Sequence, residues 1–523
     1  MEMNHLPKYP VSTADFERIR TRDYIYVDKT AYIHTLVTRG VYYFLSRPRR
    51  FGKSLLISTL EAYFHGKRNL FKGLAIERLQ PDEWNAYPVL RFDMSRGMFI
   101  DRTGINTVLD GFLKEYEKEY GIEKEDEAPS ARLAHIIKSI NSRTKKRVVV
   151  LIDEYDSPLS GVVDNPELFE YNRGVLHGFY SVLKAMDPYI HFCMLTGVTK
   201  FGKMSVFSGL NNLEDISMDN RYAGICGITN KELHDYFEKS ISYLGISCDW
   251  DIKQTYENLK FNYDGYHFSD SMEDVYNPYS VLNCLESRKI GPYWSMSGMP
   301  TLLVRLLKEN DFDINELNGA EVTADQLSAL IYENIDPIAL FYQTGYLSIK
   351  GYDREFDLYT VGYPNREVEK SLLSGILTGY CPSINRVEGI VSKMTQYLRK
   401  GLPGEFVKEL KSFLAGIPLQ LRKKVGVYEN YYHTIFYCVT RLLGLNVKAE
   451  YSTSEGFIDI LIETKKYIYI VELKVNGNAA AALRQIEEKH YSASFESDSR
   501  MVYKIGIGFS KQSGTIDSVE IAG

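Results

Sequence analysis

The sequence predicts an α/β protein of several domains, and three observations support this prediction. The chain has 523 residues, which is too many for one hydrophobic core, so roughly two to four domains are expected. Short apolar runs of strand type alternate with amphipathic stretches in the N-terminal part, as in a parallel sheet covered by helices. A second group of strand-type runs lies near the C-terminus, where a second α/β domain is expected.

Composition and charge exclude several classes of protein. Apolar residues make up 44% of the chain and charged residues 25%, as in ordinary globular proteins. The net charge of -6 excludes a chain coated in basic surface, so nucleic acid would have to bind at local patches. The six cysteines form no C-x-x-C pair, which argues against a zinc site or a disulfide framework. No apolar run approaches membrane-spanning length, and a cytoplasmic protein is expected.

The first motif has the form of a phosphate-binding loop between a strand and a helix. An apolar run from Tyr42 to Leu45 is followed by Gly52-Lys53-Ser54 and by an amphipathic helix predicted from Leu55 to His65. The backbone N–H groups of such a loop, together with the helix N-terminus, hold phosphates. Lys53 would reach the β- and γ-phosphates of a nucleotide, and the Ser54 hydroxyl would bind Mg²⁺.

The loop departs from the general pattern G-x-x-x-x-G-K-[ST] at Arg47, which replaces the first glycine. Because the short Gly-Lys-Ser motif is common by chance, a second motif is needed. Arg147 to Ile152 predicts a buried strand that ends in Asp153 and Glu154, which is the form of a Walker B strand. Asp153 would help to hold Mg²⁺ and Glu154 would polarise the attacking water. The simpler alternative is a core strand with a polar end.

Other elements are predicted around these two motifs. Thr196 ends the apolar run that begins at His191, where its hydroxyl could sense the γ-phosphate or could cap the strand. A further strand is predicted at 89–94, and helices are predicted at 104–120 and 131–140.

Three motifs make this part similar to the AAA-ATPase-like family common in bacteria of gut and anaerobic habitats: 47–54 (RPRRFGKS), 151–156 (LIDEYD) and 207–212 (FSGLNN). The resemblance implies ATP and Mg²⁺ as cofactors, and Arg47 is a normal feature of that family. Arg49 and Arg50 then join Gly52 as candidate nucleotide contacts, and contact with a neighbouring subunit is left open for the two arginines. Members of this family typically end in a PD-(D/E)xK nuclease-like domain.

The middle of the chain is predicted to be mostly helical. Residues 228–311 suit a helical lid on an ATPase core, and 341–349 with 356–361 predict a β-hairpin after a helix, as in a winged-helix-like module. The acidic character of the hairpin favours packing over DNA binding. The predicted domains are an AAA-like P-loop ATPase core at 1–225, a helical lid and winged-helix-like connector at 226–415, and a nuclease-like domain with the α/β restriction-endonuclease-like fold at 416–523.

The C-terminal part is predicted to fold in the order α-β-β-β-α-β. A helix begins at Glu429 and stops before Gly444, and Lys465-Lys466 is a candidate two-residue hairpin turn. The other elements predicted here are strands at 447–451, 456–462, 467–475 and 501–508 and a helix at 479–491.

The polar residues of these strands suggest a metal site. Alternation places Glu472 and Lys474 on one face of their strand, and a two-residue turn would set Asp459 directly opposite Glu472. Two adjacent carboxylates call for a cation, and oxygen ligands without Cys or His favour Mg²⁺ or Mn²⁺. Lys474 would help to activate a water and to stabilise charge on a phosphate. The alternative is an amphipathic hairpin in which Lys474 only pairs with Glu472.

An Asp followed by Glu-x-Lys on consecutive strands resembles the PD-(D/E)xK nuclease signature. The resemblance implies catalytic or metal-binding roles for five residues that are all present: Glu429, Asp459, Glu472, Lys474 and Gln485. The chain departs from many relatives at Phe457, where they have Arg, so a contact with a substrate phosphate is expected to be missing.

The predicted function is that of a bacterial ATP-binding and ATP-hydrolysing protein coupled to a metal-dependent DNA nuclease site. Nucleic acid and a second copy of the chain are the expected partners, and no membrane is expected. The alternative is a nucleotide-dependent regulatory switch whose C-terminal domain binds nucleic acid or a partner without cleaving it. A third hypothesis is a defence or toxin effector that ATP holds in check.

Overall fold

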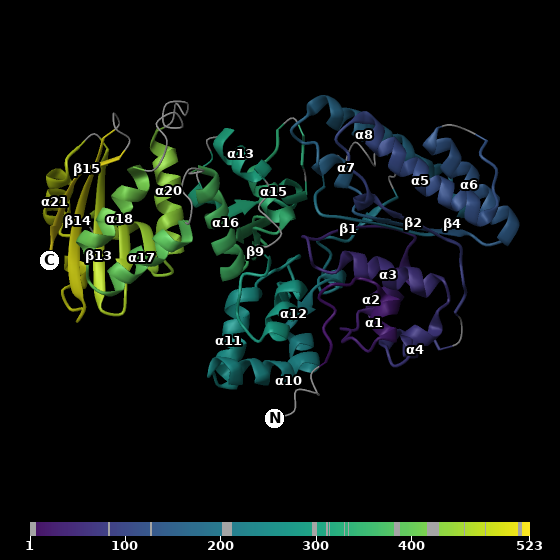
Figure 1. Ribbon diagram of the computed structural model, residues 1–523, viewed down its shortest axis with the longest axis horizontal. Coiled ribbons are helices and arrows are strands. Elements are labelled where there is room, and N and C mark those ends of the chain that lie inside the picture. The colour runs from purple at the N-terminus through teal and green to yellow at the C-terminus, as the bar shows by residue number, and fades with distance from the viewer. Residues whose placement is uncertain are drawn as a thin grey trace. The chain divides into compact units, whose positions relative to one another are not determined.

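The computed structural model describes residues 7–523, apart from 82–83, 126–127, 201–211, 295–300, 310–311, 313, 329, 333, 381–386, 416–427, 454, 476 and 511–514. The chain separates into two compact units, the first formed by residues 1–298 and 317–369 and the second by 299–316 and 370–523 (Figure 1). Most of the predicted motif at 207–212 and the predicted domain boundary at 416 lie outside the described residues. The division into three domains stays a prediction.

A parallel sheet forms the centre of the first unit, as the sequence predicted. Its strands are β1 (Tyr42–Ser46), β2 (Val89–Asp93), β3 (Val148–Asp153), β4 (Ile190–Gly197) and β5 (Glu214–Asp215). They lie in the order β2-β3-β4-β1-β5 and pair in parallel. Because the strands are parallel, their carboxyl ends meet at one edge of the sheet, where the loop after β1 and the acidic end of β3 both lie.

Helices cover both faces of this sheet (Figure 1). One face carries α5 (Arg102–Tyr120), α6 (Pro129–Thr144) and α8 (Pro166–Ala185), and the short α7 (Ser157–Ser160) follows β3. The side chain of Asp101 caps α5 by accepting hydrogen bonds from backbone N–H groups of its first turn. The other face carries α1 (Phe16–Thr21), α2 (Thr30–Arg39), α3 (Lys53–Phe64) and α4 (Ala75–Leu79).

The predicted helical middle is present in the first unit. It contains α10 (Asn230–Cys248), α11 (Ile252–Tyr263) and α12 (Pro278–Ser287), with a small ladder between β6 (Ile228–Thr229) and β7 (Val275–Tyr276). Capping boxes begin α10 and α11, at Thr229 and Asp251. These helices enclose their own apolar core, which includes Leu233, Phe237, Leu259 and Val281.

The predicted hairpin is present, but its first strand begins later than expected. Phe341 to Thr344 belong to α15 (Pro337–Thr344), and β9 begins at Ser348. Gly345 has a φ of 88° and caps the helix in the left-handed region, so the run that resembled one strand contains a helix end and a turn. The sheet β8-β10-β9 consists of β8 (Ala320–Val322), β9 (Ser348–Asp353) and β10 (Leu358–Gly362), and α14 (Ala324–Ser328) lies between β8 and α15 in the chain.

The second unit contains a mixed sheet with helices on both of its faces (Figure 1). Its strands are β11 (Asn446–Thr453), β12 (Gly456–Glu463), β13 (Tyr467–Val475), β14 (Met501–Ser510) and β15 (Thr515–Ala522), in that order. The strands β13 and β14 are parallel and the other pairs antiparallel. The helices are α13 (Thr301–Glu309), α16 (Arg366–Tyr380), α17 (Val387–Arg399), α18 (Pro403–Ala415), α20 (Tyr428–Leu442) and α21 (Ala479–Glu488).

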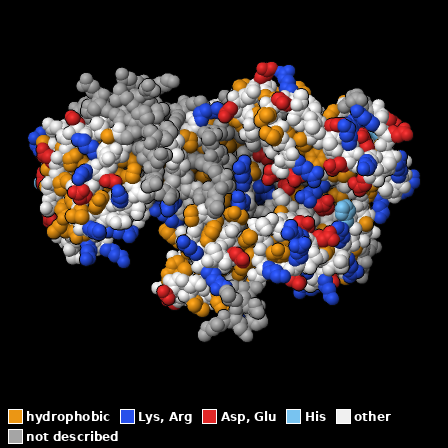
Figure 2. Space-filling view, viewed as in Figure 1, with side chains coloured by type: hydrophobic (Ala, Val, Ile, Leu, Met, Phe, Trp, Pro, Cys, Tyr) orange, Lys and Arg blue, Asp and Glu red, His pale blue; other side chains and the backbone are white. Residues whose placement is uncertain are grey.

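The predicted α-β-β-β-α-β order is confirmed, and β15 adds a strand that the prediction lacked. This edge strand is largely exposed, with Ile516 as its one buried residue, so it has no apolar run that would have revealed it. On the coloured face in Figure 2, basic and acidic side chains are interspersed. Within the described ranges, no helix is long and apolar enough to cross a membrane.

Candidate nucleotide site and candidate metal centre

The strand, loop and helix predicted from the first motif are present. The strand β1 ends at Ser46 and α3 begins at Lys53, so the loop comprises six residues of the motif between them. Gly52 has a φ of 98° and Arg50 a φ of 67°, both in the left-handed region. A glycine suits the first of these positions because it adopts this conformation without strain. The loop therefore turns sharply into the N-terminus of α3.

Lys53 is buried inside its own loop. Its Nζ atom donates hydrogen bonds to the carbonyl oxygens of Arg47, at 2.8 Å, and Pro48, at 3.0 Å. Burial lowers the pKa of Lys53, and the nearby carboxylates of Glu154 and Asp153 oppose that shift. The ammonium group thus lies between the loop backbone and the acidic end of β3, where a phosphate chain bound by the loop would pass.

Arg47, which replaces the first glycine of the general pattern, anchors the loop. The side chain is 1% exposed and donates to the carbonyl oxygens of Ser217, at 2.6 Å, and Tyr222, at 3.2 Å. Its guanidinium group also lies over the ring of Phe268, 4.1 Å from the centroid. These contacts join the loop to the segment after β5 and to the middle of the unit, which gives a physical reason for an arginine at this position.

The acidic end of β3 lies beside the phosphate loop. Asp153 is 2% exposed and accepts a hydrogen bond of 2.6 Å from the hydroxyl of Thr196 on β4. Glu154 has a φ of 51°, a conformation that non-glycine residues seldom adopt and that is common at functional sites. Burial is the largest cause that raises the pKa of Glu154; Lys53 opposes the shift and Asp153 adds to it.

A polar pocket of about 490 Å³ lies at this edge of the sheet. Its walls contain Ser54, Asp153 and Glu154, together with Asp93 at the end of β2. The register pairs Asp93 with Asp153 on the neighbouring strand. The pocket thus brings together three residues that the sequence predicted and one, Asp93, that it did not.

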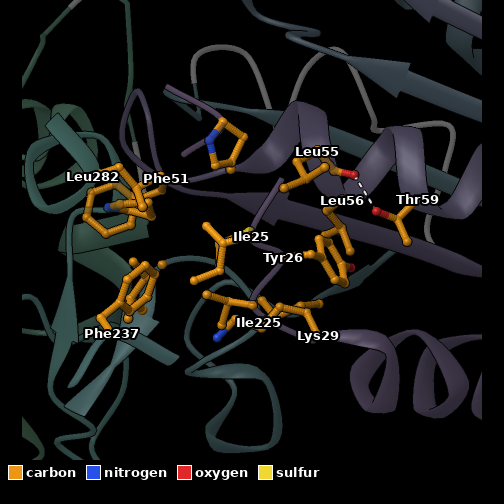
Figure 3. Close-up of a pocket in the computed structure, with 17 residues that line it drawn as sticks. Ile25, Tyr26, Lys29, Phe51, Leu55, Leu56, Thr59, Ile225, Phe237 and Leu282 are labelled. Atoms are coloured by element: carbon orange, nitrogen blue, oxygen red, sulfur yellow. Dashed lines mark hydrogen bonds between the residues drawn. The ribbon is translucent and has the colours of Figure 1, made fainter. Parts of the chain in front are cut away.

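A second pocket is apolar and has Gly52 among its lining residues. Figure 3 shows this pocket. It is built from the segment before α2, the loop, the start of α3, the segment after β5 and the middle helices. The residues that Figure 3 labels around it include Ile25, Tyr26, Leu55, Phe237 and Leu282. Lys29 lies in the same wall and is held by the carbonyl oxygen of Gly224, at 2.7 Å, and by Glu232, at 2.6 Å.

Arg49 and Arg50 lie outside both pockets. Both side chains are exposed, and the guanidinium group of Arg50 lies over the ring of Tyr279 on α12, 3.7 Å from the centroid. Neither arginine lines the polar or the apolar pocket. Their predicted contact with nucleotide stays a prediction.

The sequence did not single out a network that holds the chain after β4. Asp156 accepts hydrogen bonds from the backbone N–H of Thr199, at 2.7 Å, and from its hydroxyl, at 2.6 Å. The N–H of Lys200 donates to Gln343 on α15, and the Nζ of Lys200 donates to Asp215. Asp156 belongs to the acidic motif and could have been suspected, whereas Lys200 and Gln343 have no local sequence signal.

The hairpin turn predicted in the second unit is present at Lys465-Lys466. The N–H of Thr464 donates to the carbonyl oxygen of Tyr467, at 2.8 Å, and closes the two-residue turn. The recorded pairs of β12 and β13 run from Glu463 with Ile468 as far as Ile460 with Val471, one residue short of the predicted pair of Asp459 with Glu472, so that pair stays a prediction. Asp459 accepts a hydrogen bond of 2.7 Å from the N–H of Leu473.

Glu472 is the most buried carboxylate of this site, at 1% exposure. Its Oε1 atom accepts hydrogen bonds from Lys474, at 3.2 Å, and from Gln485 on α21. Its Oε2 atom is buried and has no hydrogen-bond partner among the described residues. Burial raises the pKa of Glu472 to about 7, and the nearby Asp459 carboxylate adds to the shift.

These donors fit a hard divalent cation. Asp459 and Glu472 supply oxygen atoms, and a buried carboxylate oxygen without a partner is costly unless a cation or another donor meets it. Glu429 lies in α20, but its side chain is outside the described residues. Among the side chains that are described, no group of three or more His, Cys, Asp and Glu is arranged to hold a metal ion. The complete predicted ligand set therefore stays a prediction.

The two folds define a P-loop protein of the AAA class that also carries a C-terminal nuclease-like domain. Residues 10–207 match the family model described as "Predicted AAA-ATPase", and residues 427–519 match the PD-(D/E)XK nuclease superfamily. The chain is 35% identical over 522 residues to an uncharacterized protein in the vnfD 5'region of Azotobacter chroococcum mcd 1, with 97% of this chain and 98% of that one covered. The chain belongs to the same AAA-ATPase-like family with a C-terminal PD-(D/E)XK domain.

A solved structure also shows a distant likeness. The Aeropyrum pernix ORC2 protein, solved as ADPNP–ADP complexes, is 11% identical and aligns over 72% of this chain and 97% of its own, with a TM-score of 0.26. A score this low supports no argument.

Proposed function

We propose that this protein binds and hydrolyses ATP and that its C-terminal domain hydrolyses phosphodiester bonds in DNA with a divalent cation. The observation that supports this most strongly is the group formed by Glu472, Lys474, Gln485 and Asp459, in which one buried oxygen of Glu472 has no hydrogen-bond partner among the described residues. A buried carboxylate oxygen without a partner is costly, and a bound cation would offset that cost. We also keep the proposed domains, 1–225, 226–415 and 416–523, and the expectation of a self-associating cytoplasmic protein.

In the proposed nucleotide site, each pocket has its own role. The apolar pocket beside Gly52 would receive the base, and the polar pocket would receive the phosphates. The ammonium group of Lys53 would exchange its hydrogen bonds to the loop carbonyls for contacts with the β- and γ-phosphates. Ser54 and Asp153 would hold Mg²⁺. Glu154, whose pKa burial raises, would orient the attacking water.

The hydroxyl of Thr196 has two proposed roles that depend on the same contact. It donates to Asp153 in the structure, so it fixes the orientation of that carboxylate. A γ-phosphate near the end of β4 would compete for the same hydroxyl. We therefore keep Thr196 as a candidate phosphate sensor that acts on Asp153.

In the proposed nuclease site, Asp459, Glu472 and Glu429 would hold Mg²⁺ or Mn²⁺. Such a cation, when bound, supplies positive charge to the phosphate and acidifies a water molecule. The Nζ atom of Lys474 lies 3.2 Å from Glu472, one of the proposed metal ligands. Its ammonium group would therefore be close enough to contact a scissile phosphate bound to the cation. Gln485 would keep Glu472 in position by donating to the oxygen that Lys474 also contacts.

The test is a cleavage assay on the purified full-length protein with Mg²⁺ or Mn²⁺ and several nucleic acids. Metal-dependent cleavage that is lost in Lys474→Ala and Asp459→Ala would support the proposal. If Lys474→Ala and Asp459→Ala cleave as fast as the unaltered protein, the proposed roles of these residues are wrong. If the unaltered protein cleaves none of the DNA substrates, the proposed nuclease activity is wrong.

The nucleotide-dependent switch is the second candidate, and one observation favours it. Arg221 is one arginine that could complete an ATPase site in a neighbouring subunit. In this chain it pairs with Asp219, at 2.5 Å, and with Glu214, at 2.7 Å. If Arg221 stays in these ion pairs, the protein could bind ATP and release it unhydrolysed. Tight ATP binding without ADP production would support the switch.

A further inference from the structure

Phe457 is an aromatic side chain that the fold leaves in solvent beside the proposed nuclease site. It is 63% exposed, although it lies within β12 of a sheet whose other apolar residues are mostly buried. It is the first residue after Gly456, which pairs with Thr453. Its partner across the strands is Ser452, a small and exposed residue. The ring therefore lies near the end of the β11–β12 ladder, with most of its surface in solvent.

The position of Phe457 relates it directly to the carboxylates. Side chains two residues apart in a strand share a face, so Phe457 lies on the face of Asp459. The side chain of Asp459 accepts a hydrogen bond from the N–H of Leu473, the residue between Glu472 and Lys474. The side chain of Lys474 is 34% exposed and reaches Glu472 at 3.2 Å. The exposed ring thus lies two residues along β12 from a carboxylate that contacts the strand of Glu472 and Lys474.

The structure also gives a reason why this ring stays outside the core. The space behind the hairpin tip is occupied by Tyr491, a residue only 2% exposed. A Cβ atom placed on Gly456 would lie 3.0 Å from the Tyr491 hydroxyl, and Gly456 has a φ of 145°. The core under the tip is thus already full, and Phe457 cannot be explained as a core residue of this hairpin.

We propose that Phe457 stacks on an unpaired nucleobase next to the phosphate that Lys474 contacts, and that it gives the site a preference for single-stranded nucleic acid. One sugar separates a base from its own phosphate. A ring that stacks on the base therefore has to lie close to the group that contacts the phosphate. An unpaired base can offer its face to an aromatic ring, whereas a base in a duplex is already stacked. This inference rests on the proposed nuclease function, and it adds the class of substrate.

The test measures binding in the presence of EDTA, which removes divalent cations and so prevents the proposed cleavage of the nucleic acid. Fluorescein-labelled single strands of DNA and RNA and the matching DNA duplex are titrated with the full-length protein by anisotropy. Because one stacked base contributes about 1–3 kcal/mol, Phe457→Ala is expected to weaken single-strand binding roughly fivefold or more and duplex binding less than about twofold. Phe457→Trp restores the affinity. Phe261→Ala removes an equally exposed phenylalanine, 63%, on α11 of the first unit and leaves binding unchanged.

An oligonucleotide with one abasic site separates stacking from a general loss of structure. The abasic site is moved along the strand in a series of oligonucleotides. At one of these positions the unaltered protein should bind more weakly than it binds the intact strand. Phe457→Ala should bind the two strands equally. The inference is overturned by equal losses on single strand and duplex, by no loss at all, or by absence of single-strand binding in the unaltered protein. Failure of metal-dependent cleavage alone would reject the nuclease proposal and leave this binding result standing.

Discussion

The two candidate sites of this protein differ in how their charged groups are satisfied. In the first unit, Lys53 bonds to loop carbonyls and Asp153 accepts from Thr196, so the charged groups already have partners within the protein. In the second unit, Glu472 keeps one buried oxygen without a partner among the described residues. The charged groups of the nucleotide site are therefore held by the protein itself, whereas one carboxylate oxygen of the C-terminal site is left for the cation that we propose.

The two sites also differ in the range of contacts that build them. Arg47 reaches Ser217 and Tyr222, and Lys200 reaches Gln343, so the phosphate loop depends on segments far away in the chain. The described side chains of the C-terminal site come from one hairpin and one helix. Removal of Arg47, which anchors the phosphate loop, should therefore affect folding as well as chemistry.

The largest effect is expected for Asp459→Asn. Removal of this negative charge should lower metal-dependent DNA cleavage by roughly 1,000-fold, because a cation at the site loses a charged ligand. The rate of ATP hydrolysis should stay unchanged. Asp517→Asn, which changes an exposed carboxylate on β15, is the matched control and should keep full cleavage. An equal fall in both activities would show that the two sites are not separate.

The next effect concerns Glu154→Gln in the first unit. Loss of a base that orients water should slow ATP hydrolysis roughly 100-fold, while ATP binding changes by no more than a few fold. Phosphate release and fluorescent-nucleotide binding measure the two quantities. Glu115→Gln changes an exposed glutamate on α5 and serves as the control. A parallel loss of binding would mean that Glu154 shapes the pocket and does not act on water.

A smaller effect, on stability, is expected for Arg47→Gly, which restores the general glycine pattern of the loop. The change removes the side-chain donor to three carbonyl groups and the contact with Phe268, so it should lower the free energy of unfolding by about 2–4 kcal/mol and weaken ATP binding. Arg221→Ala removes an exposed ion pair and should cost less than about 1 kcal/mol. Improved ATP binding in Arg47→Gly would contradict the anchoring role.

The smallest effect is on the free energy of unfolding, and it compares two buried glutamates whose pKa values are raised to the same value. Burial raises the pKa of Glu367 and of Glu472 to about 7, from an ordinary value of 4.5. Below the ordinary value both are protonated in the folded and unfolded states. As pH rises from about 4.5 to about 7, the unfolded state ionises first, so the free energy of unfolding falls across this window. Glu367→Gln and Glu472→Gln should each remove that loss, so each is more stable than the unaltered protein at about pH 8 in EDTA and similar to it at about pH 5.

Addition of Mn²⁺ should then separate the two variants. Glu367 accepts hydrogen bonds from Ser280 and from the N–H of Trp294, both at 2.7 Å, and has no part in the proposed metal site. At a Mn²⁺ concentration of about 100 times the Kd, the unaltered protein and Glu367→Gln should gain about 2.7 kcal/mol, and Glu472→Gln should gain far less. Thermal unfolding at several pH values measures both effects. An equal gain in all three proteins would place the cation elsewhere.

Much of the fold could be predicted because its signals are local. The apolar run before the phosphate loop, the strand ending in Asp153 and the turn at Lys465-Lys466 each lie within a few consecutive residues, and all three are present. The turn predicts the register of β12 and β13, which is recorded as far as Ile460 with Val471, since strand register follows from turn length. Local patterns therefore predicted the backbone around both sites.

The parts that were missed depend on contacts between distant segments or on weak patterns. The helix end at Gly345 was mistaken for a strand because a short apolar run fits either structure. The edge strand β15 carries too few buried residues to be recognised. The roles of Arg47 and Lys200 depend on partners more than one hundred residues away, as the separations of 170 for Arg47 with Ser217 and 143 for Lys200 with Gln343 show.

The coupling of ATP to cleavage that the sequence predicts means that ATP at the first site should control phosphodiester hydrolysis at the second. The most direct measurement is the rate at which the full-length protein cleaves labelled DNA with Mg²⁺, with and without saturating ATP, beside Lys53→Ala. We expect a cleavage rate that changes with ATP in the unaltered protein and does not change in Lys53→Ala. The same rate with and without ATP in the unaltered protein would contradict it.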